Sequence, residues 1–240
     1  MYKWLGWKNE LSYLHEKTIM KKILILSVLC SILVSMKPVA KKHIVFFGDS
    51  ITQAGVGPKG YITVLGDILK EKNLQEQYQL TGAGIGGNKV YDLYLRMEDD
   101  VLAKDPQVVV IWVGVNDVWH KRSYGTGTDA DKFEKFYNAI IKKFKSKNIE
   151  VLLCTPAAIG EKTDFSNELD GDLNKYAQII RNIATNNNCP LIDLRKEFLA
   201  YNLANNPKNL DRGILTTDGV HLNDAGNKLV AEAMMKALIR

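Results

Sequence analysis

Short, mostly apolar segments alternate with stretches in which apolar residues recur at helical spacing, from about residue 41 to the end of the chain. Each short segment is long enough for one strand, and together they occupy 43–47, 77–80, 108–113, 149–154 and 190–193. Between and after them, the spacing of apolar residues predicts helices over about 61–72, 88–97, 129–145, 173–186, 194–203 and 223–238. Strands that alternate with helices in this way predict a parallel sheet.

The order of the predicted elements defines the fold class. About five parallel strands joined by right-handed helical crossovers form a three-layer α/β/α sandwich with a flavodoxin-like sheet. Ser50, Gly87 and Asn116 follow the first, second and third predicted strands. Because parallel strands end at one edge of the sheet, we expect these three residues on the edge where open α/β folds bind ligands. After Ser50 we expect a glycine-rich loop and no helix before about residue 61.

The start of the chain has the pattern of a targeting segment. A charged start at Met20–Lys22 precedes Ile23–Met36, a run of fourteen residues interrupted only by serines and a cysteine. This run is short for a membrane span, which needs about 20 residues, and is typical of a signal-peptide core. We therefore predict a signal peptide over 20–40. Pro38 makes a poor cleavage site, so an uncleaved anchor remains the alternative.

This pattern divides the chain into a leader over residues 1–40 and one domain over residues 41–240. Residues 1–19 lie awkwardly upstream of a signal peptide, and we interpret them as an over-long start of the reading frame. A leader of this kind predicts export, with a periplasmic or extracellular location.

Charge and motif content exclude several classes of function. The net charge is +5, but the leader carries six of the 32 basic residues and two of the 27 acidic ones, which leaves 26 basic and 25 acidic residues elsewhere. No basic field remains for nucleic acid. We find neither metal-ligand spacing nor a phosphate-binding motif, so we expect no metal and no cofactor.

A serine, a histidine and an aspartate suggest acyl-transfer chemistry. Gly48–Asp49–Ser50 puts a hydroxyl directly after the first predicted strand, although this sequence alone is most typical of a turn. A serine becomes a good nucleophile when a base removes its proton. His221 is the plausible base, because the other histidines lie in the leader, at the start of the first strand and in the loop after the third. Asp218, three residues earlier, can reach the His221 Nδ1–H across a tight turn.

Four sequence blocks resemble those of the SGNH/GDSL hydrolases. They read GDSIT at 48–52, GIGGN at 84–88, GVND at 114–117 and DGVH at 218–221. Their order and spacing match the family across nearly all of residues 41–240. The resemblance implies the SGNH hydrolase fold and a serine esterase without metal or cofactor, in which Ser50, Asp218 and His221 are catalytic.

The resemblance also assigns an oxyanion hole to the backbone N–H groups of Ser50 and Gly87 and to the side chain of Asn116. A glycine allows close approach of its N–H to a substrate, and an Asn amide carries two donor hydrogens. Gly86 remains an alternative to Gly87. The family often has an aspartate after these glycines, whereas Asn88 stands here; we interpret Asn88 as a helix cap.

The predicted substrate is a short-chain ester, chiefly an acetyl ester, of a carbohydrate or a small alcohol. Trp119, His120 and Tyr124 lie in the predicted polar loop after Asn116, and flat aromatic faces suit sugar rings; simple packing of Trp119 is the alternative. No long apolar insertion that would line a fatty-chain channel follows the first three strands. The alternatives are a lysophospholipase or thioesterase-type lipid acyl hydrolase, and a non-catalytic carbohydrate-binding module on the same fold. We expect no nucleic-acid partner, and membrane contact only through an uncleaved leader.

Overall fold

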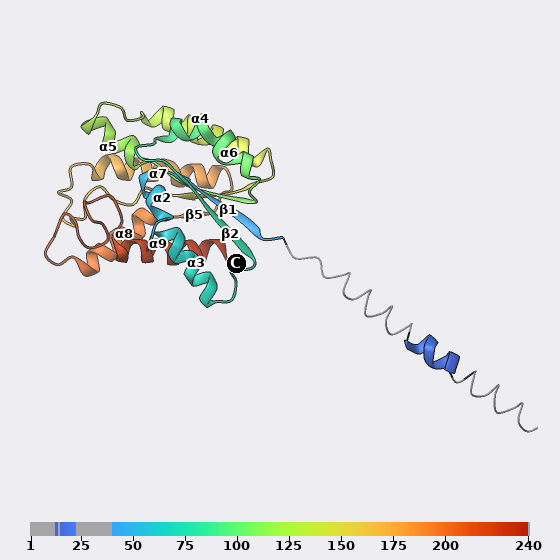
Figure 1. Cartoon of the computed structure of the whole chain (residues 1–240). Helices are drawn as coiled ribbons and strands as arrows, with labels where there is room; N and C mark the ends of the chain where they lie inside the picture. Colours follow the sequence, from blue (N-terminus) through green and yellow to red (C-terminus); the bar gives the residue numbers. More distant parts are fainter. Residues whose placement is uncertain (1–12, 14, 23–39, 240) are drawn as a thin grey trace, which may run out of the picture. The chain divides into compact units, whose positions relative to one another are not determined.

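The computed structural model describes residues 13, 15–22 and 40–239 (Figure 1). The chain divides into two units, residues 1–40 and 41–240. In the first unit, residues 15–22 are helical, and most of the predicted signal-peptide core lies outside the described residues. Within the part of the chain that is described, no helix is long and apolar enough to cross a membrane. The second unit, residues 41–240, contains all five strands of the described residues.

A five-stranded, fully parallel sheet forms the centre of this unit, as predicted. The strand order is β2-β1-β3-β4-β5, which is the flavodoxin-like order. The strands are β1 (Lys42–Gly48), β2 (Tyr78–Gly84), β3 (Val108–Trp112), β4 (Glu150–Cys154) and β5 (Leu191–Ile192). In the register, Gly48 pairs with Gly84 on one side and with Trp112 on the other. The segments that follow β1, β2 and β3, which carry Ser50, Gly87 and Asn116, therefore leave the sheet at the same level.

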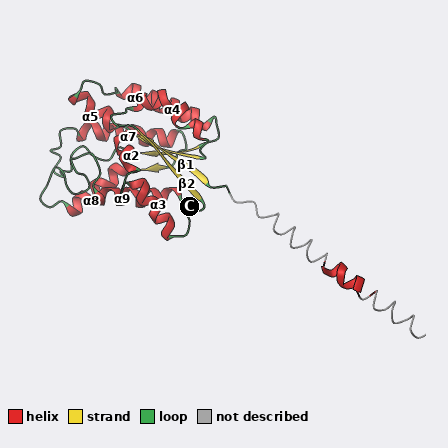
Figure 2. Cartoon of the chain, viewed as in Figure 1, coloured by secondary structure: helices red, strands yellow, loops and turns green. Residues whose placement is uncertain are grey.

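Helices cover both faces of the sheet (Figure 2). One layer contains α3 (Tyr61–Glu71), α8 (Leu194–Asn205) and α9 (Asp224–Leu238). The other contains α4 (Val90–Asp100), α6 (Ala130–Lys145) and α7 (Asp170–Asn186), with the short 3₁₀ turn Leu102–Lys104 after α4. Two shorter helices, α2 (Ser50–Gly55) and α5 (Val115–Ser123), begin at the carboxyl ends of β1 and β3. This is the predicted three-layer α/β/α sandwich.

The alternation of side chains along β1 builds the two cores. Ile44 and Phe46 pack into the cluster under α3, α8 and α9, whereas Val45 and Phe47 pack into the cluster under α4, α6 and α7. All four side chains are fully buried. A central parallel strand is covered on both faces, which is why this segment reads as a continuous apolar run.

Four local predictions were wrong. Ser50 begins the helix α2 instead of a loop, and Trp119 and His120 lie on the helix α5, with Tyr124 at its C-cap. Asn88 does not cap α4: Lys89 occupies that position, and its backbone N–H donates to the Asp92 side chain. Both missed helices are short, and neither presents the long amphipathic repeat on which the sequence prediction depends. The strand β2 also extends through Gly84, beyond the predicted end at residue 80.

Candidate active site

The nucleophile candidate lies at a sharp strand-to-helix junction. β1 ends at Gly48, and the buried Asp49 caps α2 by accepting a 3.0 Å hydrogen bond from the Ile51 N–H. Ser50 is the first residue of α2, where a backbone N–H has no acceptor within the helix. The helix packs directly on β2, because a β-carbon at Gly84 would lie 2.1 Å from the Gln53 nitrogen. Only glycine at this position lets the Ser50 turn sit so close to the sheet.

Asp218 and His221 form a tight turn on the segment before α9. Asp218 Oδ2 lies 2.7 Å from His221 Nδ1, and Asp218 Oδ1 accepts the backbone N–H groups of Val220 and His221 at 3.0 and 2.8 Å. Burial raises the pKa of Asp218, but hydrogen bonds from the His221 side chain and from these backbone groups outweigh it and leave the pKa below its usual value. The ionised carboxylate accepts the Nδ1 hydrogen, which leaves Nε2 as the acceptor.

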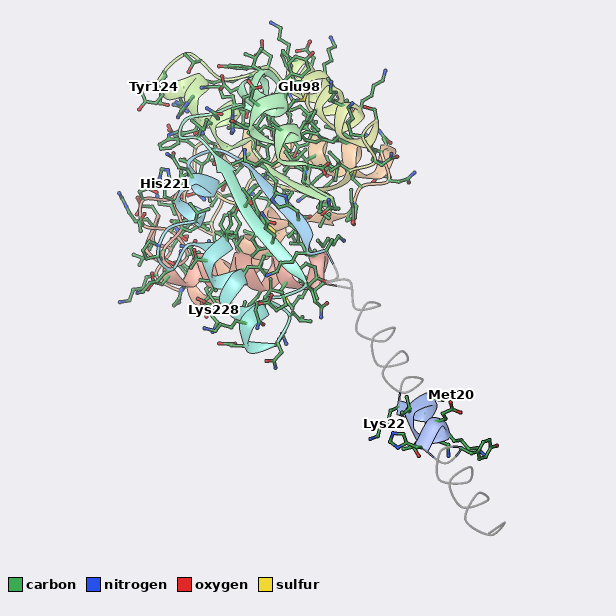
Figure 3. All side chains as sticks on the ribbon, turned by 45° about the vertical axis from the view of Figure 1, so that its right-hand side comes forward. Met20, Lys22, Glu98, Tyr124, His221 and Lys228 are labelled. Carbon is green, nitrogen blue, oxygen red and sulfur yellow. The ribbon has the colours of Figure 1, made fainter. Side chains whose placement is uncertain are left out.

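The structure brings the three predicted catalytic residues together. His221 Nε2 lies 3.0 Å from Ser50 Oγ. The hydroxyl, the imidazole and the carboxylate therefore form one continuous hydrogen-bonded chain, the geometry in which a histidine can take the proton of an attacking serine. The His221 side chain is 38% exposed, so the chain of groups is open to solvent; Figure 3 shows His221 and Tyr124 on the same side of the unit.

The predicted oxyanion donors Gly87 and Asn116 belong to the segments that follow β2 and β3, the two strands that pair with β1. Gly87 has a left-handed backbone, with φ of 75°, which favours glycine. The N–H of the alternative residue, Gly86, already donates to Gln53 Oε1 at 2.8 Å, which favours Gly87 as the donor. The buried Asn116 lies in the first turn of α5, and its Nδ2 donates to the Asn88 carbonyl at 3.1 Å. Because a carbonyl oxygen can only accept, the end of the Asn116 amide that faces it must be the NH₂ group. The second hydrogen of this NH₂ group is available for another acceptor.

Comparisons with known proteins identify the family of the chain. Residues 46–229 match the model of the GDSL-like Lipase/Acylhydrolase family. The chain belongs to this family. The crystal structure of an acetyl xylan esterase, AlAXEase, is 70% identical, with a TM-score of 0.81 over 82% of this chain and 100% of that one. An acetylxylan esterase of Geobacillus stearothermophilus is 26% identical over 85% of this chain and 96% of its own length. An uncharacterised lipoprotein of Bacillus subtilis, YqeF, is 24% identical over 92% and 99%.

Membership of this family makes the chain a carboxylic ester hydrolase, and the structure shows how the segment that carries Gly87 is fixed. Lys89 is buried and donates to the Gly87 carbonyl at 3.0 Å, and Asp117 Oδ1 accepts the Val90 N–H at 3.1 Å. Arg96 donates to Asn88 Oδ1 at 2.7 Å, and also to the carbonyls of Gly48 and Ala83 at the ends of β1 and β2. These anchoring side chains escaped the sequence analysis, because their partners are mainly backbone groups that no sequence pattern reveals.

The three aromatic side chains predicted to contact substrate gather at this edge. The Trp119 ring lies 6.5 Å from the His221 ring, and the His120 ring lies 4.8 Å from that of Tyr124. A β-carbon at Gly87 would lie 3.7 Å from His120 Cε1, so His120 borders the proposed oxyanion hole. Burial, followed by the nearby charge of Lys89, lowers the pKa of His120. Tyr124 is 71% exposed.

Metal-ligating groups do not gather here. Within residues 13, 15–22 and 40–239, no three histidine, cysteine, aspartate or glutamate side chains are placed to hold a metal ion.

Proposed function

We propose that Ser50, His221 and Asp218 carry out ester hydrolysis through an acyl-enzyme. The observation that carries this proposal is the hydrogen-bonded chain from Ser50 Oγ through His221 to Asp218, with distances of 3.0 and 2.7 Å. Ser50 Oγ attacks the ester carbonyl carbon while His221 Nε2 takes the hydroxyl proton. Asp218 stabilises the imidazolium that forms and keeps the ring in the required orientation.

The carbonyl oxygen becomes an oxyanion in the tetrahedral intermediate. In this proposal it accepts hydrogen bonds from the N–H groups of Ser50 and Gly87 and from the free Nδ2 hydrogen of Asn116, all of which are positioned before the reaction. Collapse of the intermediate breaks the bond to the alcohol, which leaves with the proton from His221. A water molecule then repeats the sequence on the acyl-enzyme and releases the acid.

The proposed substrate is an acetyl ester of a carbohydrate, with acetylated xylan as the first candidate. Two relatives that cover most of this chain are acetylxylan esterases. Trp119 lies beside His221, and His120 and Tyr124 continue from it in a row of ring contacts; these side chains offer flat faces for a sugar ring. A lipid acyl hydrolase remains the alternative, and the acyl-length series argued in the Discussion separates the two.

Acetate release from acetylated xylan tests this proposal. The wild-type domain should release acetate, and the Ser50→Ala protein should not. Release that survives Ser50→Ala would overturn the catalytic assignment. Labelling by a fluorophosphonate adds a second measurement, because only an activated serine reacts; a folded wild-type protein that stays unlabelled would favour the non-catalytic carbohydrate-binding module.

We further propose that residues 1–40 are a leader, that residues 41–240 are the hydrolase domain, and that the protein is exported. The apolar run Ile23–Met36 after a charged start supports a leader, and one relative is named as a lipoprotein. Cell fractionation, with sequencing of the N-terminus of the mature protein, tests this. A protein that remains in the cytoplasm with an intact N-terminus would contradict it.

A further inference from the structure

The segment that carries Asp218 and His221 has little regular structure of its own. Between the end of α8 at Asn205 and the start of α9 at Asp224, the backbone forms turns and local hydrogen bonds, and its one strand-like pairing is an isolated bridge between Thr216 and Leu222. Proton transfer to His221 nevertheless requires a defined distance to Ser50. Contacts from elsewhere in the fold must therefore set the position of this segment, called here the catalytic segment (residues 206–223).

Glu161 supplies the central contact. Its side chain is 1% exposed, and its two carboxylate oxygens accept the backbone N–H groups of Leu215 and Ile214 at 2.6 and 2.8 Å. A buried carboxylate is costly unless hydrogen bonds satisfy it. Here both oxygens are occupied by the catalytic segment, a few residues before Asp218.

The backbone next to Glu161 extends this contact towards the proposed acid and base. Glu161 N–H donates to the Asp211 carbonyl at 3.0 Å, and Gly160 N–H donates to the Gly219 carbonyl at 2.9 Å. Gly219 lies between Asp218 and His221. Residues 160–161 thus bind the catalytic segment at two places. One is Asp211, before the turn that bears Asp218 and His221, and the other is Gly219, within that turn.

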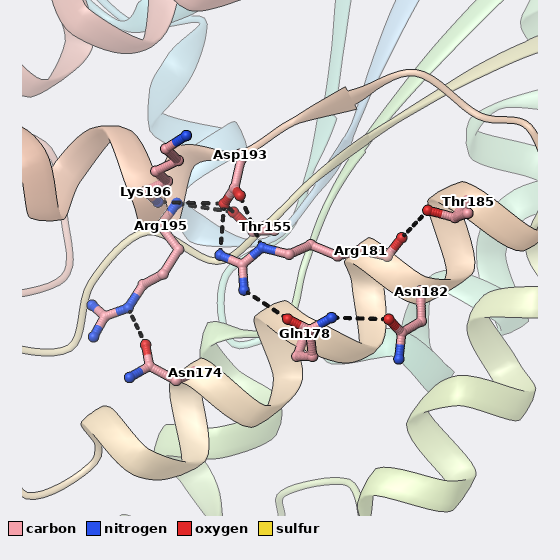
Figure 4. A network of polar contacts seen from close by, with 9 residues as sticks. All are labelled: Thr155, Asn174, Gln178, Arg181, Asn182, Thr185, Asp193, Arg195 and Lys196. Carbon is pink, nitrogen blue, oxygen red and sulfur yellow. Dashed lines mark hydrogen bonds and ion pairs between the residues drawn. The ribbon is translucent and has the colours of Figure 1, made fainter.

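Residues 160–161 lie in the connection from β4 to α7, and this connection is held near both of its ends. The buried Arg195 donates to the Ala157 carbonyl at 3.2 Å and to Asp170 Oδ1 at 2.6 Å. Its backbone N–H donates to Thr155 Oγ1, just beyond β4, and its Nε donates to Asn174 on α7 (Figure 4). Arg195 thereby ties the connection that carries Glu161 to β4, α7 and α8.

We propose that Glu161 is a positioning residue for catalysis: its carboxylate fixes the catalytic segment so that His221 Nε2 stays within hydrogen-bond reach of Ser50 Oγ. This inference rests on the catalytic roles proposed above for Ser50 and His221. It follows that removing the Glu161 contact slows proton transfer and leaves ester binding largely intact, because the oxyanion donors lie on other segments.

Glu161→Gln is the sharpest variant. The amide has nearly the same shape, but its NH₂ group faces a backbone N–H and cannot accept from it, so one of the two bonds is lost. Glu168→Gln is the matched control: it makes the same chemical change in the same connection, at an exposed residue whose 3.0 Å ion pair with Arg122 is on the surface and contributes little to stability.

The experiment measures kcat and KM for p-nitrophenyl acetate, expressed per site that a fluorophosphonate labels at completion, together with the labelling rate. We expect Glu161→Gln to lower kcat per labelled site and the labelling rate in parallel, by about tenfold to a hundredfold, the loss that a misplacement of about 1 Å can cause. KM should change little, and Glu168→Gln should match wild type. A crystal structure of Glu161→Gln should show a lengthened Ser50–His221 contact.

A purely structural role for Glu161 would give a different result. It would reduce the number of labelled sites through unfolding, while each remaining site would turn over at the wild-type rate; that result would overturn the proposal. If Glu161→Gln does not fold, Glu161→Asp keeps the charge but shortens the side chain, and the same per-site measurement decides. Should Ser50→Ala retain activity, the proposed function itself fails, whereas an inactive Ser50→Ala with a fully active Glu161→Gln refutes only the positioning role.

Discussion

His221 Nε2 lies 3.0 Å from Ser50 Oγ, although 171 positions separate the two residues in the sequence. Ser50 is fixed by the junction of β1 with α2, whereas His221 belongs to the irregular segment between α8 and α9. Two independently supported pieces of backbone therefore meet at one hydrogen bond, and the proposed reaction depends on both.

Ser50→Ala and His221→Ala should each lower kcat by at least about 10³-fold and leave the residual rate that the oxyanion donors supply alone. Asp218→Ala should cost less, because the aspartate orients and stabilises the histidine without itself taking the substrate's proton. Steady-state kinetics with p-nitrophenyl acetate measure all three. Activity above a tenth of wild type in Ser50→Ala would show that this serine is not the nucleophile.

Asn116→Ala should behave as the loss of one oxyanion donor, with kcat reduced roughly 10²–10³-fold and KM little changed. Asn182→Ala, an exposed asparagine on α7, makes the same truncation away from the site and should match wild type. If Asn116→Ala instead binds ester poorly but turns it over normally, Asn116 binds substrate and does not stabilise the oxyanion.

Two buried carboxyl groups near the site should make stability depend on pH. Burial raises the pKa of Asp49 and of Asp117 to about 7, whereas each returns to the ordinary value of about 3.9 on unfolding. The folded protein therefore binds more protons between these values, and the contribution of these groups to stability falls as pH rises from about 4 to 7. Within the described residues, Asp117 Oδ2 has no hydrogen-bond partner, so its charge is poorly compensated.

Asp117→Asn should consequently gain stability relative to wild type as pH rises, with most of the gain present by about pH 8. Thermal unfolding of both proteins at pH 5 and pH 8 measures the difference, and Asp67→Asn, which changes an exposed carboxyl on α3, is the control. The Asn side chain can still accept the Val90 N–H. A difference in unfolding temperature that is the same at both pH values would show that Asp117 does not titrate in this range.

The sheet was predictable because its signal is local. β1, β3 and β4 are buried on both faces and appear as continuous apolar runs, so their positions, and hence the edge shared by Ser50 and Asn116, follow from the pattern. The helices α2 and α5 could not be predicted in this way, because each is short and begins close to the end of a strand. The helix α2 begins with one contact, in which the Asp49 side chain accepts the Ile51 N–H. From the sequence alone, this helix cap cannot be distinguished from a turn.

The proposed catalytic side chains were also easier to find than the residues that place them. Ser50, Asp218 and His221 stand in recognisable blocks, whereas Arg96 and Glu161 act on backbone groups of segments far away in the sequence. A backbone N–H or carbonyl belongs to every residue type, so nothing in the sequence marks it as a partner. Asn88 illustrates the same limit: its side chain accepts from Arg96, a contact that competes with the capping role its residue type suggests.

The acyl-length preference should favour the shortest esters. In p-nitrophenyl esters of increasing chain length, we expect kcat/KM to be highest for acetate and to fall by octanoate. Each buried methylene would contribute about 0.8 kcal/mol, so an enzyme with an apolar channel should show a steep rise with length instead. His120 lies beside Gly87 and Trp119 lies beside His221, and the ring nitrogens of both side chains make them partly polar.

The same series can be run with Trp119→Ala, which tests whether the aromatic edge serves the sugar or the acyl group. If the ring supports a sugar, the variant should lose activity on acetylated xylan while p-nitrophenyl acetate, which has no sugar, is hydrolysed at close to the wild-type rate. Equal losses on both substrates would show that Trp119 mainly packs against the His221 segment. A maximum at octanoate or beyond in the wild-type series would refute the carbohydrate assignment and favour a lipid acyl hydrolase, because only an extended apolar acyl site gains free energy from each added methylene.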